Sequence, residues 1–195
     1  MAENMQHHSV KLCILLLVIG TSLAMLLVAL PATTPTSFSA IQEYCNEQYM
    51  YCVSVPSSGK LEAHEGDAPN HGATIKLSEP GNEAWTYAHW DAALLRSSRK
   101  AALSRLEILL DKHPNAEAIM RRTMIAGMSA YRIRLNYDDT RPATEELIIA
   151  YCKPKNESQG PGTIYEIGLH CSQSSYSANV SVLEALLSTF RRIGK

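Results

Sequence analysis

The densest group of side chains that could do chemistry lies in residues 62–71, which read EAHEGDAPNH. Imidazole nitrogens bind zinc, and carboxylate oxygens also bind harder divalent cations. The metal-ligating candidates are His64, Glu65, Asp67 and His71. Their spacing fits neither an HExxH motif nor a calcium-binding loop, and a solvated loop can have the same composition. A metal-dependent hydrolase that uses His64 and His71 is therefore an alternative only, and we expect no cofactor.

Other catalytic signatures are missing from the sequence. Serine is abundant, but no residue run matches a G-x-S-x-G elbow, and QGPGT at residues 159–163 lacks the lysine of a phosphate-binding loop. We therefore expect no catalytic residues.

Basic side chains form two groups that could bind an acidic protein, because a guanidinium fork pairs well with carboxylates. The partner-binding candidates are Arg96, Arg99, Lys100, Arg132 and Arg134. A solvated surface is the ordinary alternative for both groups. If the long central helix covers the strand face that carries Arg132 and Arg134, they must instead pair with acidic neighbours such as Glu145 or Glu166.

Charge and size limit the classes of function. The 195 residues carry 18 basic and 19 acidic side chains, for a formal net charge of −1, so no overall field favours nucleic acid. This length suits one globular domain and an appendage, and 46% apolar residues can form a core.

Residues 12–30 contain no charged side chain. They match the about 20 residues that cross a bilayer and exceed the about 7–15 of a cleaved signal core. Lys11 precedes them and the next basic residue is Lys60, so residues 1–11 are predicted to be cytoplasmic. We expect a signal anchor at 12–30, a linker at 31–40 and an extracytoplasmic domain at 41–195. Cleavage near Ser39, which would release a secreted protein, is the alternative.

The cysteines agree with export, because Cys45, Cys52, Cys152 and Cys171 favour two disulfides in an oxidising compartment. Four buried free thiols are the alternative. If 145–153 and 163–171 form a hairpin, about seven residues at ~3.3 Å each separate Cys152 from Cys171, beyond the ~7 Å limit between bridged Cα atoms. Each is therefore expected to pair with Cys45 or Cys52.

Periodicity predicts the elements that position these residues. The expected strands are 49–56, 73–78, 118–125, 128–137, 145–153 and 163–171. Apolar spacing predicts a long helix over 82–110, capped by Asn82, or two helices with a break near 97–98. Residues 180–190 present one apolar helical face. The fold class is therefore α+β, with an antiparallel sheet covered by the central and C-terminal helices.

Several local runs in this order resemble the PsbP/DcrB-like family, which includes the photosystem II extrinsic protein P and small bacterial envelope proteins. The runs are VSVP, IAGMSAYRIRLNY, YEIGLHC and LLSTFRRI, and the resemblance spans residues 48–193. It implies an α/β/α sandwich and a non-enzymatic protein that assists assembly, binds partner proteins or acts as an accessory envelope component.

These observations together predict a protein of the bacterial inner membrane whose periplasmic domain binds another protein. An immunity protein that neutralises a toxin in the same compartment is the alternative among binding proteins.

Overall fold

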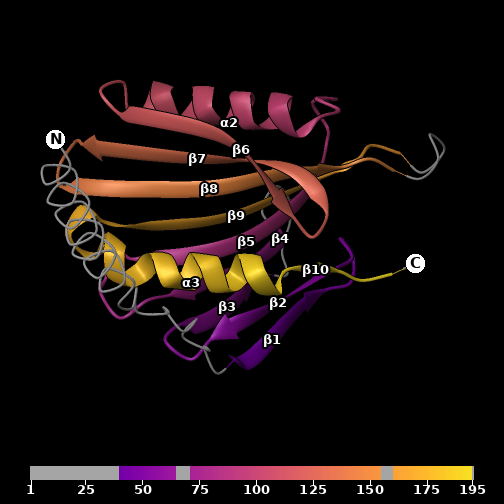
Figure 1. Ribbon diagram of the computed structural model, residues 1–195, viewed down its shortest axis with the longest axis horizontal. Coiled ribbons are helices and arrows are strands. Elements are labelled where there is room, and N and C mark those ends of the chain that lie inside the picture. The colour runs from indigo at the N-terminus through magenta and orange to yellow at the C-terminus, as the bar shows by residue number, and fades with distance from the viewer. Residues whose placement is uncertain (1–39, 65–70, 155–159, 195) are drawn as a thin grey trace, which may run out of the picture. The chain divides into compact units, whose positions relative to one another are not determined.

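The computed structural model describes residues 40–64, 71–154 and 160–194, which form a β-rich domain with two α-helices (Figure 1). The strands are β1 (Ala40–Asn46), β2 (Tyr51–Pro56), β3 (Lys60–His64), β4 (His71–Lys76), β5 (Glu83–Trp90), β6 (Glu117–Ile125), β7 (Met128–Asp138), β8 (Pro142–Cys152), β9 (Thr163–Ser172) and β10 (Arg191–Arg192). The helices are α2 (Ser98–Lys112), the 3₁₀ turn η2 (Gln173–Ser175) and α3 (Tyr176–Thr189).

The larger sheet is antiparallel and has seven strands in the order β3-β4-β5-β9-β8-β7-β6. Helix α2 packs on β7 and β8, on what we call the α2 face. The opposite α3 face carries α3, which also packs against β2 of a small sheet in the order β1-β2-β10 (Figure 1). Helices that cover an antiparallel sheet in this way confirm the predicted α+β class.

Each face of the large sheet has its own apolar core. Under α2, the buried residues include Ile133, Leu147 and Ile149. On the α3 face, Ile167 packs with Leu183 of α3 and other buried residues. The alternation along β7 puts Ile133 and Leu135 under α2 and turns Arg132 and Arg134 to the α3 face.

Gly168 of β9 makes room for a tryptophan. It lies directly opposite Trp85 of β5, and a Cβ atom at Gly168 would be 2.2 Å from Cζ2 of that indole. The indole Nε1 then donates a hydrogen bond of 3.0 Å to Glu166 on the same strand. Any larger residue at 168 would displace the ring.

The predicted long helix is wrong over its first part, because residues 83–90 form the strand β5 and α2 begins only at Ser98. β5 lies inside the sheet and buries residues on both faces, among them Trp85, Thr86 and Ala88. Such a strand lacks the alternation of a half-buried strand, so its apolar residues also fit a helical period. Asn82 is no helix cap: its side chain donates to Ser175 Oγ and accepts from the Ser172 backbone N–H.

The segment from 57 to 72, between the strands expected at 49–56 and 73–78, was given no strand by the sequence, but it contains β3 and the start of β4. The sequence prediction also missed β1, which pairs with β2 through a short turn. Lys60 and Glu62 give β3 the polar composition of a loop, whereas its backbone pairs with β4 along its whole length.

The disulfide prediction is wrong in its pairing. Cys45 and Cys52 bond to each other, and Cys152 and Cys171 are free thiols. Cys45 and Cys52 are directly opposite in the β1–β2 ladder, with their Cα atoms 4.1 Å apart. Since β1 was not predicted, this cross-strand pair could not be foreseen.

No helix among residues 40–64, 71–154 and 160–194 is long and apolar enough to cross a membrane. The expected anchor at 12–30 lies outside the described residues.

Candidate protein-binding surface

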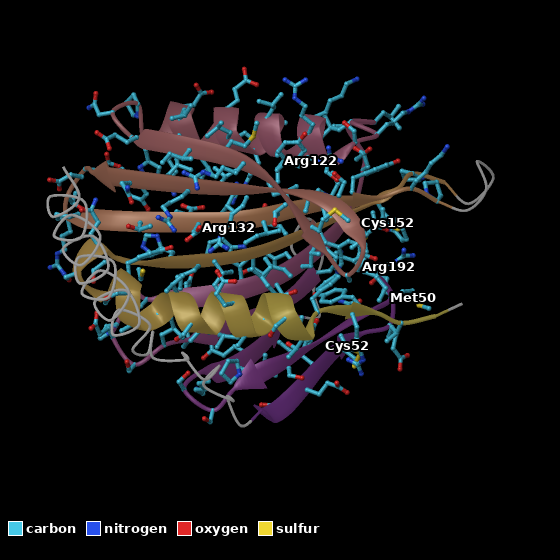
Figure 2. All side chains as sticks on the ribbon, viewed as in Figure 1. Met50, Cys52, Arg122, Arg132, Cys152 and Arg192 are labelled. Atoms are coloured by element: carbon cyan, nitrogen blue, oxygen red, sulfur yellow. A yellow bond between two sulfur atoms is a disulfide. The ribbon has the colours of Figure 1, made fainter. Side chains whose placement is uncertain are left out.

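Arg132 and Arg134 hold a buried carboxylate. Glu146 of β8 is 1% exposed and accepts a hydrogen bond of 2.5 Å from Arg132 Nε. Arg134 Nε lies 3.3 Å from its other oxygen, which also accepts a hydrogen bond from the Tyr176 hydroxyl. Arg132 Nη2 is 2.7 Å from Glu184 of α3. The arginines therefore connect β7 and β8 to α3 on the α3 face of the sheet. Arg132 is labelled in Figure 2.

The ionisation of this cluster follows from its contacts. Burial alone would raise the pKa of Glu146, but hydrogen bonds from Arg132 and Tyr176, with the two arginine charges, outweigh burial and lower that pKa. Burial, reinforced by the hydrogen bond to Glu146, raises the pKa of Tyr176 to about 12. The carboxylate therefore stays charged and paired, so the arginines have a structural role.

The acidic partners expected from the sequence lie on the other face. Glu145 and Glu166 are buried beneath α2, where Arg105 Nε is 3.1 Å from Glu166 and Nη2 is 3.8 Å from Glu145. Burial raises the pKa of Glu145, and the charge of Arg105 opposes this only in part. The long central helix α2 therefore does not cover the face of Arg132 and Arg134, and these arginines pair with Glu146 and Glu184 on the α3 face instead.

The other basic group lies at the start of α2. Arg96 precedes the N-cap Ser97, whose side chain accepts a hydrogen bond from the Lys100 backbone N–H. Arg96, Arg99 and Lys100 are exposed, and the first turn contains no acidic residue. A helix N-terminus carries partial positive charge and is stabilised by anions. Helix stability therefore does not explain three cations at this end.

A buried aspartate shapes the turn before α2. Asp91 is 1% exposed, and its carboxylate accepts hydrogen bonds of 2.8 and 2.7 Å from the backbone N–H groups of Leu95 and Arg96. Its own N–H donates to Gly162 O at 2.7 Å, which joins the turn to the start of β9. This fixes the backbone although Leu94 and Arg96 have φ angles of 52° and 58°.

Backbone strain concentrates at the end of the sheet where α2 begins. Non-glycine residues with positive φ in the described part of the chain are Met50, Leu94, Arg96 and Ala126. Each L residue in this conformation costs about 1 kcal/mol, and such strain clusters at functional sites. Met50 and Leu94 are also exposed, Leu94 by 57%. A glycine or asparagine would be more stable at both positions.

We call this region the end surface and define it by Met50, Trp90, Leu94, Arg96, Cys152, Lys153 and Arg192. A cavity of about 470 Å³ lies within it, lined among others by Met50, Trp90, Cys152 and Arg192. Figure 2 shows Met50, Cys152 and Arg192 together at the right-hand end of the molecule. Trp90 is 44% exposed and packs against Tyr49, with ring centroids 5.0 Å apart. The end surface therefore combines exposed apolar side chains with basic groups.

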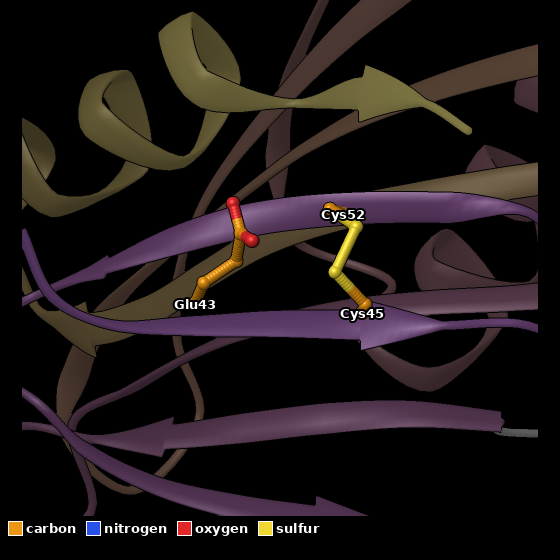
Figure 3. A group of neighbouring side chains, drawn as sticks. All are labelled: Glu43, Cys45 and Cys52. Atoms are coloured by element: carbon orange, nitrogen blue, oxygen red, sulfur yellow. A yellow bond between two sulfur atoms is a disulfide. The ribbon is translucent and has the colours of Figure 1, made fainter.

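The predicted metal ligands are largely outside the described structure. Glu65 and Asp67 lie outside the described residues, as does the side chain of His64, whereas the ring of His71 packs on Tyr49 with centroids 5.2 Å apart. Glu43, Cys45 and Cys52 also lie close together (Figure 3). The two sulfur atoms are bonded to each other, so neither is a thiolate that could bind a metal.

The chain shares its fold with solved PsbP-like proteins. It resembles the cyanobacterial PsbP of Synechocystis at 11% identity, with a TM-score of 0.52, over 84% of this chain and 98% of that one. It also resembles LpqN of Mycobacterium tuberculosis at 12% identity, with a TM-score of 0.56, over 74% of this chain and 83% of that one. The sequence matches no protein-family model and no curated protein. The resemblance to the PsbP/DcrB-like group is thus confirmed as one of fold.

Sequence reasoning found part of the end surface and missed the rest. It selected Arg96, but not Met50, Trp90 or Leu94, since an exposed apolar residue cannot be told from a core residue by type. The positive φ angles have no sequence signal either, because neither Met50 nor Leu94 is a residue type that favours them.

Proposed function

We propose that this chain is a non-enzymatic accessory protein of the cell envelope that binds another protein outside the cytoplasm through the end surface. The observation that carries the proposal is that Met50 and Leu94 combine exposed apolar side chains with positive φ. Both features lower the stability or solubility of an isolated domain, and both are typical of surfaces that bind a partner.

Two further observations support a place in the envelope. The structure of LpqN is described as that of a protein involved in cell envelope biogenesis, and that protein has the same fold. The bond between Cys45 and Cys52 fits an oxidising compartment, in which such bonds persist. An anchor at residues 12–30 belongs to the same proposal.

The chemistry of the end surface specifies the partner. Arg96, Lys153 and Arg192 supply positive charge, whereas the nearby carboxylate of Asp91 is buried and fully used by backbone N–H groups. Trp90 and Leu94 supply apolar contact area. The partner segment should therefore present carboxylates beside an apolar side chain.

Site-specific photocrosslinking of the full chain in its native envelope tests the proposal. The photoreactive amino acid is placed at Leu94 or at Trp90. The matched control is Ile108, which is 56% exposed on the same domain but lies in the C-terminal half of α2, outside the end surface. We expect one crosslinked protein from Leu94 and Trp90 and none from Ile108.

Equal crosslinking from all three positions, or none at Leu94 and Trp90, contradicts the proposal. The identity of the captured protein separates the two binding functions. An envelope component supports the accessory role, and an exported toxin supports the immunity role.

A further inference from the structure

Strand β6 is one of the two edges of the large sheet, and no strand within residues 40–64, 71–154 and 160–194 pairs with its outer side. Its residues are mostly exposed, including Ile119 at 50%. An open strand edge presents unpaired backbone N–H and C=O groups, and it therefore favours pairing with another strand. This edge begins beyond the C-terminal end of α2, near Ile119, and runs toward the β6–β7 turn beside the start of α2, where Ser98 Oγ donates a hydrogen bond to Ser129 O.

The β6–β7 hairpin determines which backbone groups point outward. Its two-residue turn, Ala126-Gly127, has φ angles of 45° and 76°, and it joins the closing pair Ile125 and Met128. In such a hairpin the closing pair exchanges both backbone hydrogen bonds, and every second pair along the ladder does the same. The odd-numbered residues of β6 therefore bond to β7. Ala118, Met120 and Arg122 direct their N–H and C=O groups outward.

The charges of β6 select a register for pairing with itself. Glu117 is the acidic residue of this strand, and Arg121 and Arg122 are its basic ones. A two-fold axis through Ile119 puts Glu117 of each copy opposite Arg121 of the other, and Ile119 opposite Ile119. It also brings the outward-facing Ala118 and Met120 together in the hydrogen-bonded pairs. An axis through Arg121 would instead set like charges opposite each other, which is destabilising.

We propose that β6 pairs antiparallel with β6 of a second copy of this chain, about an axis through Ile119. Ile119 lines a groove of about 270 Å³ together with Arg121, Arg132, Arg134 and Glu146. In the pair, Ile119 of the second copy covers this groove. The two large sheets then become one continuous sheet.

Disulfide trapping of the full chain in membranes tests the register. Ile119→Cys places two thiols in a non-hydrogen-bonded cross-strand pair, whose Cα atoms are about 4.5 Å apart. Oxidation should therefore yield a covalent dimer. The control Thr123→Cys lies on the same face of β6, but its two copies are about 26 Å apart in this register, and wild type controls for the native thiols. A dimer trapped at Thr123, or none at Ile119, overturns the register.

Charge exchange tests the interface without a crosslink. Light scattering of the full wild-type chain in detergent should show dimers. Arg121→Glu and Glu117→Arg should each raise the dissociation constant of the dimer about tenfold or more, since either change makes two like-charge pairs. Mixing these two variants should restore dimers, because the changed residue of each copy then lies opposite a residue of unlike charge in the other copy. Wild type that stays monomeric, or a mixture no tighter than either variant alone, rejects the proposal.

Discussion

Glu145 and Glu146 are neighbours in β8, yet their carboxyl groups lie on opposite faces of the sheet and their pKa values shift in opposite directions. Burial raises the pKa of Glu145, where Arg105 is 3.8 Å away. For Glu146, burial acts the same way, but hydrogen bonds from Arg132 and Tyr176 outweigh it. The pair provides a matched set of variants, because the same substitution removes a stabilising charge at one position and an unfavourable one at the other.

Glu146→Gln should lower the free energy of unfolding at pH 7 by about 2–3 kcal/mol, because it leaves two partly buried arginines without their carboxylate. Glu145→Gln should change it by less than about 1 kcal/mol, since it removes a charge that burial disfavours. Urea unfolding followed by circular dichroism measures both. A larger loss for Glu145→Gln than for Glu146→Gln would contradict the assigned roles.

The same variants should differ in pH dependence. The pKa of Glu146 is lower in the folded chain, so its contribution is fully present above the ordinary value of 4.5 and is lost as pH falls through the folded value. The stability gap between wild type and Glu146→Gln should therefore narrow below about pH 4.5. The pKa of Glu145 is raised in the folded chain, so the free energy of unfolding of wild type should rise relative to that of Glu145→Gln as pH falls. Unfolding curves between pH 3 and 7 check both slopes.

Thiol labelling should distinguish the cysteines of the unfolded, unreduced chain. Peptide mass spectrometry should find Cys152 and Cys171 modified, and Cys45 and Cys52 only after reduction. Replacing Cys45 and Cys52 by alanine should cost about 2 kcal/mol, as expected for closing a loop of this length. Protection of Cys152 and Cys171 before reduction would indicate the pairing first expected from the sequence.

Leu94→Asn should maintain or raise the free energy of unfolding by up to about 1 kcal/mol, because asparagine tolerates positive φ better than leucine. It should also weaken partner binding, since it removes an exposed apolar side chain. Leu103→Asn is the control, because Leu103 is exposed within α2 and asparagine there lowers helix propensity. Thermal unfolding and crosslinking yield at Trp90 report the two effects separately.

How well the sequence predicted each element depended on its surroundings. The strands from 117 to 172 were predicted because β7 alternates cleanly between core and polar residues, with turns at its ends. β5 was missed because it is buried on both sides, and β1 because it follows a Pro- and Thr-rich run. The sequence did not single out Glu146, which lies opposite Arg134 in the β7–β8 ladder, because the register of these two strands was not predicted. Glu184 belongs to α3, and it reaches Arg132 only because this helix covers the α3 face of the sheet.

The contact between Gly168 and Trp85 has an evolutionary consequence. Because the indole occupies the space of a missing side chain, neither position can change freely without the other. Relatives that keep this packing should show covariation: a larger residue at the position of Gly168 should accompany a smaller one at the position of Trp85. This coupled pair offers a residue-level test of whether another chain of this fold shares the packing of this core.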